Sequence, residues 1–135
     1  MRGIALALAA ACALGGCASV APPACEPGLA RMEQAELFFG REMTGRGMVS
    51  EEEWRQFLDE EVTQRFPDGF SVADVYGQYR NHAGAIAREQ SKQLVIVTAG
   101  GSADQAKLNA IRDAYKRRFN QESVLLVEAP VCAGF

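Results

Sequence analysis

Six segments with strand or helix patterns follow one another in this chain of 135 residues, and their order limits the possible folds more than any single motif does. The patterns predict strand, helix, strand, strand, helix and strand over residues 35–43, 50–65, 70–80, 85–98, 102–119 and 124–127. Right-handed crossovers join such elements into one sheet with both helices on the same face. We therefore expect an α+β fold, a ferredoxin-like split βαββαβ sandwich with a four-stranded antiparallel-type sheet, in which the first and third strands are central.

Capping and breaking residues support these boundaries. Ser50 followed by Glu53 is typical of a capping box at the start of the first helix, and Ser102 followed by Gln105 repeats the pattern before the second helix. We expect Pro130 to end the last strand, because proline has no N–H to donate to a strand ladder.

Three of the strands are apolar at both parities, so both of their faces need a cover. One set of side chains can pack on the helices, and contiguous apolar patches on the other face usually mark interfaces. We expect the sheet face opposite the helices to be buried, most simply by a second copy in a symmetric dimer, or alternatively by residues 18–34 folding back. In each strand the two sets of apolar side chains point to opposite faces. The sets are Leu37 and Phe39 opposite to Phe38, Leu94 and Ile96 opposite to Val95 and Val97, and Val124 and Leu126 opposite to Leu125 and Val127.

The first residues have the layout of a secretory signal. Arg2 precedes an apolar run that ends in Leu14-Gly15-Gly16-Cys17, and the run is too short to span a bilayer as a helix. This ending resembles the bacterial lipobox, which makes the cysteine the lipidated first residue of a mature lipoprotein. A plain signal peptide cut near Ala13 or Ala18 is the alternative, and it would leave Cys17 incidental.

The lipobox resemblance implies a location and an organisation. Residues 1–16 are the expected signal peptide, residues 17–34 a lipid-attached tether that contains Pro22-Pro23, and residues 35–135 a single α+β domain. By resemblance to enterobacterial sorting rules, Ala18 after the cysteine points to the outer membrane of the bacterial cell envelope. We therefore expect a membrane partner through the lipid on Cys17, with the domain facing the periplasm.

Cysteine usage agrees with an oxidising compartment. Cys12 leaves with the signal and Cys17 takes the lipid, so Cys25 and Cys132 remain as a pair, and we expect them to form a disulfide. These two cysteines and the distant His82 match no zinc spacing, so we expect no metal site. The chain has 14 Lys and Arg against 17 Asp and Glu, a net charge of −3, which argues against nucleic-acid binding through charge.

The second hairpin carries the best polar constellation of the chain. We expect its candidate ligand or partner face to consist of Tyr76, Tyr79, Arg88, Glu89 and Lys92. Arg88 and Lys92 have the same parity and would share one face, where they could bind a carboxylate or phosphate group. The alternative is a solvated hairpin with cross-strand ion pairs, each worth little.

A tight turn at residues 81–84 sets the expected register of this hairpin. Residues whose numbers sum to about 165 would then face each other. This pairing places Tyr76 opposite Glu89 and Asp74 opposite Ser91.

The rest of the chain holds no complete catalytic set. The serines have only His82 as an imidazole base, and Gly100-Gly101-Ser102 lacks the other residues of a P-loop. We expect no catalytic residue and no cofactor.

Several phrases resemble a bacterial family catalogued as domain of unknown function 3574. Together they cover nearly all of residues 35–127, and the resemblance implies a small secreted or lipid-anchored protein without assigning an activity. The phrases are Glu36-Leu37-Phe38-Phe39-Gly40, Arg65-Phe66-Pro67-Asp68-Gly69-Phe70, Arg88-Glu89-Gln90-Ser91-Lys92, Ala114-Tyr115-Lys116-Arg117-Arg118-Phe119 and Gln121-Glu122-Ser123-Val124.

These patterns together predict a cell-envelope lipoprotein whose folded domain is a non-enzymatic binding or assembly module on the periplasmic side. The alternative is a small ligand-binding or enzymatic domain that uses the polar second hairpin around Arg88 and Lys92.

Overall fold

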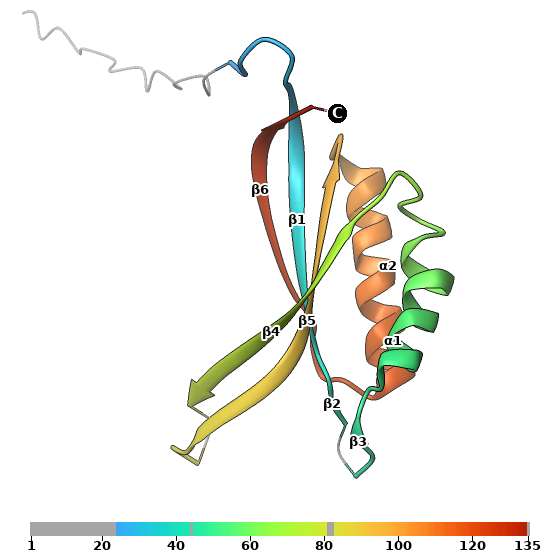
Figure 1. Ribbon diagram of the computed structural model, residues 1–135, viewed down its shortest axis with the longest axis vertical. Helices are drawn as coiled ribbons and strands as arrows, with labels where there is room; N and C mark the ends of the chain where they lie inside the picture. The colour runs from blue at the N-terminus through green and yellow to red at the C-terminus, as the bar shows by residue number, and fades with distance from the viewer. Residues whose placement is uncertain (1–23, 44, 81–82, 135) are drawn as a thin grey trace, which may run out of the picture.

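The predicted order of elements is present in the computed structural model, which describes residues 24–43, 45–80 and 83–134 (Figure 1). The four long strands form one sheet in the order β4-β5-β1-β6, and every neighbouring pair is antiparallel. The predicted α+β sandwich, with central first and third long strands, is therefore confirmed. The elements are β1 (Ala30–Gly40), β2 (Glu42–Met43), β3 (Gly47–Met48), α1 (Glu51–Phe57), η1 (Leu58–Val62), β4 (Ser71–Arg80), β5 (Ile86–Thr98), α2 (Ser102–Phe119) and β6 (Leu125–Ala133).

Several strand boundaries differ from the prediction. The first strand ends at Gly40 rather than at residue 43, and Glu42–Met43 pair instead with Gly47–Met48 as β2 and β3. β1 begins at Ala30, so residues 30–34, expected in the tether, lie in the sheet. β6 continues through Pro130 to Ala133, and the prediction that Pro130 ends the last strand is wrong. Pro130 lies opposite Glu33 on an edge strand, which pairs on one side only, and such a strand tolerates a missing N–H.

The two helices begin in different ways. At α1, the Ser50 hydroxyl accepts the Glu53 backbone N–H at 3.2 Å and the Glu53 carboxylate accepts the Ser50 N–H at 2.9 Å, so the predicted capping box is confirmed. At α2, the residue before the first turn is Gly101, with φ of 91° and no side-chain cap. The Ser102–Gln105 capping box is therefore wrong, because the glycine turn places Ser102 inside the helix rather than at its cap.

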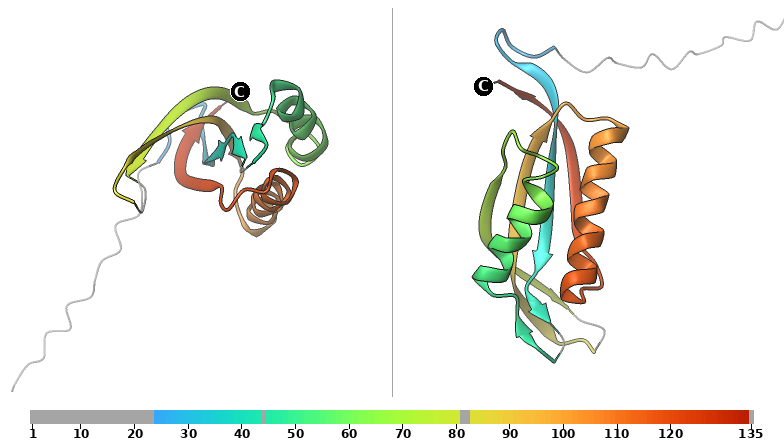
Figure 2. Two further views of the ribbon diagram at one scale, coloured as in Figure 1. Left: turned by 90° about the horizontal axis from the view of Figure 1, so that it is seen from below. Right: turned by 90° about the vertical axis from the view of Figure 1, so that its right-hand side faces the viewer.

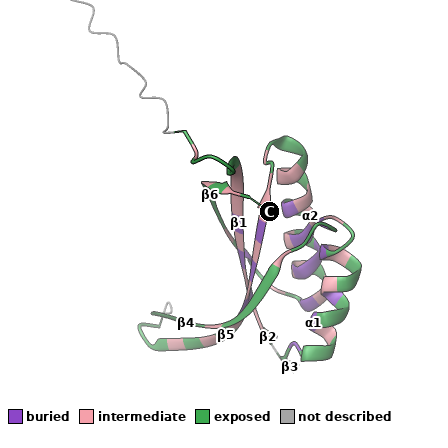
Figure 3. Cartoon of the chain, turned by 45° about the horizontal axis from the view of Figure 1, so that its top comes forward, coloured by how far each residue is buried: buried purple, intermediate pink, exposed green. Residues whose placement is uncertain are grey.

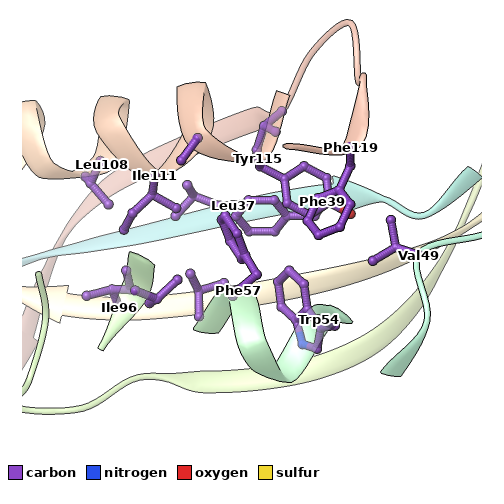
Figure 4. Close-up of a cluster of buried hydrophobic side chains, with 14 of the residues drawn as sticks. Leu37, Phe39, Val49, Trp54, Phe57, Ile96, Leu108, Ile111, Tyr115 and Phe119 are labelled. Atoms are coloured by element: carbon purple, nitrogen blue, oxygen red, sulfur yellow. The ribbon is translucent and has the colours of Figure 1, made fainter. Parts of the chain in front are cut away.

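Both helices cover the same face of the sheet (Figure 2). The centre of this contact is a cluster of aromatic rings in which Phe39 of β1 lies 4.7 Å from Tyr115 and 5.2 Å from Trp54, between ring centroids (Figure 4). The Tyr115 hydroxyl donates to the backbone oxygen of Gly40 at 2.8 Å, which satisfies the only polar atom of this buried side chain. Around the rings lie the other buried residues of the core, among them Leu37, Phe57, Leu94, Ile96, Leu108, Ile111 and Phe119.

The β4–β5 hairpin extends beyond the helices, and its far part is mostly exposed (Figure 3). Tyr76 is 80% exposed, Tyr79 57% and Ile86 54%. The hairpin therefore presents large side chains to solvent, well away from the core.

The predicted disulfide between Cys25 and Cys132 is present, with 5.6 Å between the two Cα atoms. Cys132 lies opposite Arg31 in the β1–β6 pair, and Cys25 lies just before β1. The bond therefore closes the end of the sheet where β1 starts and β6 finishes, across a sequence separation of 107 residues.

Reduction of this disulfide should destabilise the protein. Opening a loop of this size lowers the free energy of unfolding by up to ~4–5 kcal/mol in the chain-entropy model. Urea unfolding with and without reductant measures the difference, and the double variant Cys25→Ser/Cys132→Ser should be insensitive to reductant. Rapid alkylation of Cys25 and Cys132 in the unreduced, folded protein would contradict the assignment.

Candidate functional site

The β4–β5 hairpin is paired one residue away from the predicted register. Tyr76 lies opposite Gln90 and Asp74 opposite Lys92, so the predicted pairs with Glu89 and Ser91 are wrong. The physical reason is the length of the connection, which runs from residue 81 to residue 85 rather than to residue 84. One extra residue in a hairpin loop moves every pair of the ladder by one position.

This register divides the five candidate residues between the two sides of the sheet. Successive side chains along a strand point to opposite faces of the sheet. The pairing puts Tyr76, Arg88 and Lys92 on the face that the helices cover. Tyr79 and Glu89 lie on the opposite side. The hairpin therefore does not gather the five side chains into one face.

Lys92 lies at the centre of an ion network beside the core. Its side chain is buried, and its Nζ donates to Glu51 Oε2 at 2.9 Å and to Asp74 Oδ1 at 2.6 Å. Arg41 Nη1 contacts the other oxygen of the Glu51 carboxylate at 2.8 Å. Two carboxylates already neutralise Lys92, so Arg88 and Lys92 do not form the predicted anion site.

The same network shifts the pKa values of its members. The hydrogen bond from Lys92 holds the pKa of Glu51 and of Asp74 below their ordinary values. Burial by itself would lower the pKa of Lys92, but the hydrogen bonds that Lys92 donates to Asp74 and Glu51 outweigh burial and raise that pKa. The charged form of all three groups is therefore favoured in the folded protein.

Glu89 lies in a hollow of about 460 Å³ at the other side of the hairpin, and we call this the Glu89 hollow. Its apolar wall includes Phe38 of β1 and Leu125 of β6, and its polar wall includes Ser91 and Gln121. Partial burial raises the pKa of Glu89, and the nearby Glu42 carboxylate raises it further. No hydrogen-bond donor among the residues that the structure describes reaches the Glu89 carboxylate. A half-buried carboxylate with a shifted pKa in a hollow is typical of functional sites.

The second surface of interest is the face of the sheet opposite the helices, which we call the open face. Leu125 is 58% exposed and Val127 45% exposed, and no described segment covers them. Beside them, the Glu36 carboxylate accepts hydrogen bonds from Gln34 and Gln93, both at 2.8 Å. The open face thus combines five apolar side chains with a hydrogen-bonded polar group, Gln34, Glu36 and Gln93, near its middle. Its residues are Gln34, Glu36, Phe38, Gln93, Val95, Val97, Leu125 and Val127.

Two further hollows offer less chemistry. One of about 850 Å³ lies between the loop of residues 66–71 and the C-terminal end of β5, which extends beyond its pairing with β4. The other, of about 350 Å³, contains Gly100–Ser102 together with Glu33, Asp104 and Glu128, and this excess of carboxylates opposes anion binding there. Within the described residues, no group of three or more His, Cys, Asp or Glu side chains could hold a metal ion. His82 lies outside the described residues.

Two residues that shape these surfaces were not singled out from the sequence. Arg41 donates from Nε and Nη2 to the backbone oxygen of Val49, at 3.0 and 2.7 Å, and so ties the loop before α1 to the ion network. Gly40 lies directly against the Glu89 carboxylate, and a side chain at this position would overlap it. No local sequence signal links Gly40 to Glu89, because the two residues meet only through the β1–β5 pairing.

No helix in the described ranges is long and apolar enough to cross a membrane.

Comparisons with known proteins agree on the fold and leave the chemistry open. A family model described as "Protein of unknown function (DUF3574)" matches residues 34–135. No curated protein matches the chain in sequence. A phage SAM lyase in complex with S-methyl-5'-thioadenosine is similar in structure, with a TM-score of 0.57 and 18% identity over 77% of this chain and 90% of that one. CutA from Synechococcus elongatus has a TM-score of 0.51 and 18% identity, over 78% of this chain and 81% of that one.

The ion network makes a pH-dependent contribution to stability. Because the pKa values of Asp74 and Glu51 are lowered by folding, their contribution is present above their ordinary values near pH 4 and is lost as pH falls through the folded values. Asp74→Asn should therefore lose less stability than the unmodified protein between about pH 5 and pH 3. Urea unfolding at several pH values measures this slope, and Asp59→Asn, an exposed change outside the network, should keep the original slope. Equal slopes for all three proteins would contradict the assignment.

Proposed function

This chain belongs to the DUF3574 family of proteins of unknown function, and we propose that it is a lipid-anchored cell-envelope protein whose domain is a binding or assembly module. The open face is the observation that carries the proposal. Five apolar side chains from three neighbouring strands lie on one surface there beside Gln34, Glu36 and Gln93, and no described segment covers Leu125 and Val127. The five are Phe38, Val95, Val97, Leu125 and Val127. Burying such a surface against a partner is favourable in proportion to the apolar area removed from water.

The proposed anchor agrees with the position of the N-terminal end of the fold. Residue 24 lies at the end of the sheet that the disulfide closes (Figure 1). Six residues lie between Cys17 and residue 24, and the seven Cα–Cα steps that join them reach at most about 25 Å when extended. A lipid on Cys17 would therefore hold the domain close to the membrane, with its open face free to meet a neighbour on the same membrane.

A second copy of the chain is the proposed partner for the open face. The alternative cover was the segment of residues 18–34. In its described part, residues 30–34 are paired in β1, and residues 24–29 form a loop at the end of the sheet. Because Glu36 lies near the middle of the face and like charges repel, the two copies must be offset so that their Glu36 carboxylates stay apart.

Replacement of Cys17 tests the anchor. Cys17→Ala should move the protein from the membrane fraction to the soluble periplasmic fraction, because one acyl chain binds a membrane only marginally and several bind it stably. Fractionation followed by mass spectrometry measures both the location and the loss of the lipid mass. Membrane association and mass that do not change in Cys17→Ala would reject the lipoprotein proposal, and the plain signal peptide would then stand.

Replacement of Val127 tests the assembly. The lipid-free Cys17→Ala protein should self-associate, and adding Val127→Asp should shift it to monomer, because a charge would enter the apolar contact. Val72→Asp is the matched control, since Val72 is 40% exposed against 45% for Val127 but lies outside the open face. Sedimentation velocity measures the three proteins. A Cys17→Ala protein that stays monomeric at high concentration would contradict the second-copy proposal.

A further inference from the structure

The Glu89 hollow has the shape of a binding site rather than of a packing defect. Its floor is continuous with the open face, because Phe38 and Leu125 lie opposite each other in the β1–β6 pair and both line the hollow. Its other end is formed by the connection between α2 and β6, residues 120–123, and by Glu42 and Met43. A volume of about 460 Å³ admits a small organic group.

Two acceptors, the Glu89 carboxylate and the Gln121 side-chain oxygen, lie in this hollow, which Ser91, Asn120 and Ser123 also line. Gln121 donates its amide N–H to the backbone oxygen of Glu42 at 2.6 Å, which turns its side-chain oxygen toward the other side. That oxygen and the Glu89 carboxylate both lie near the position that a Cβ of residue 40 would take. Neither the carboxylate nor the amide oxygen receives a hydrogen bond from the described residues, so both can accept a hydrogen bond from a ligand.

Gly40 creates the space in which these acceptors lie. Any Cβ at this position would overlap the Glu89 carboxylate and would lie 3.5 Å from the Gln121 side-chain oxygen. The φ angle of Gly40 is not in the left-handed region, so the backbone itself does not require glycine there. A side chain at position 40 would therefore meet the movable end of the Glu89 side chain and displace its carboxylate.

We propose that the Glu89 hollow binds a cationic N–H donor, an alkylammonium or guanidinium group, whose apolar stem lies on Phe38 and Leu125. The carboxylate supplies the opposite charge, and the Gln121 oxygen supplies a second acceptor. A divalent metal ion fits less well, because the described residues contain no cluster of three carboxylate, histidine or cysteine side chains. The cation comes either from a free amine or from a lysine or arginine side chain of a protein partner.

Calorimetric titration of the full-length Cys17→Ala protein tests the proposal. The probes are n-hexylamine, n-hexylguanidine, the uncharged n-hexanol, and lysine blocked at its amino and carboxyl ends. We expect the two cations to bind at least ~10-fold more tightly than hexanol, because a charge-assisted hydrogen bond is lost with the alcohol. If blocked lysine binds with the same affinity as hexylamine, the natural ligand is a protein side chain. If its affinity is at least ~10-fold weaker, the natural ligand is a free amine.

Three variants locate the binding. Glu89→Gln keeps the size of the side chain and should weaken cation binding at least ~10-fold without changing hexanol binding. Gly40→Ala should weaken it as well, because its methyl group displaces the Glu89 carboxylate. Glu26→Gln, an exposed change at the opposite end of β1, is the matched charge control and should bind as the unmodified protein does.

The outcomes are distinct from those of the assembly experiment. Equal cation binding by Glu89→Gln and by the unmodified protein would overturn the proposal, and so would hexanol binding as tight as that of hexylamine. If Gly40→Ala fails to fold, as judged by circular dichroism, Glu89→Gln still decides. The titration is run at a concentration at which sedimentation velocity shows the monomer, because the stem would lie on Phe38 and Leu125, which the second-copy contact would bury. Its failure would therefore leave the anchor and the second-copy contact standing.

Discussion

The packing of Phe39 against both helices is the interaction on which the rest of the structure depends. Its ring contacts Trp54 and Phe57 from α1 and Tyr115 from α2, with centroid distances of 4.7 to 5.9 Å. This contact directs the odd-numbered side chains of β1 toward the helices, and strand alternation then directs the even-numbered ones to the open face. The same ring cluster seats Tyr115, whose hydroxyl bonds to Gly40 and so holds the end of β1 beneath Glu89. The two surfaces to which we assign function are therefore consequences of one aromatic core.

The short β2–β3 pair was not predicted from the sequence, and the burial of the face opposite the helices stays a prediction. The alternation of apolar residues was sufficient to predict the four long strands, the two helices and the face of the sheet that the helices cover. These features depend on burial, which a sequence expresses directly in the spacing of its side chains. The hairpin register was not predictable to one residue, because it depends on a loop whose length cannot be distinguished from its neighbours by composition. With the register shifted by one residue, Lys92 pairs with Asp74 and Glu51 instead of being available to a ligand. A clue was present, since Lys92 shares its parity with the buried Leu94.

Sites built from distant segments were harder still. Glu89 was singled out among the polar residues of the hairpin, but the features that make it distinctive come from elsewhere in the chain. Gly40 leaves the space, Gln121 adds the second oxygen, and Leu125 supplies part of the floor. Two predicted boundaries were wrong for a related reason. At the start of α2, Gly101 occupies the N-cap position that was assigned to Ser102. In β6, Pro130 does not end the strand, because an edge strand tolerates a missing N–H.

The central claim is that the open face is an interaction surface in the envelope, and hydroxyl-radical footprinting of the protein in its native membranes tests it most directly. This measurement compares the oxidation of side chains that are similarly exposed in the isolated chain. The account predicts that Leu125 and Val127 on the open face are protected relative to Ile86 and Tyr79 on the projecting hairpin, and that detergent dilution removes the protection. Equal oxidation of both groups in intact membranes would mean that nothing covers the face, and would contradict the account.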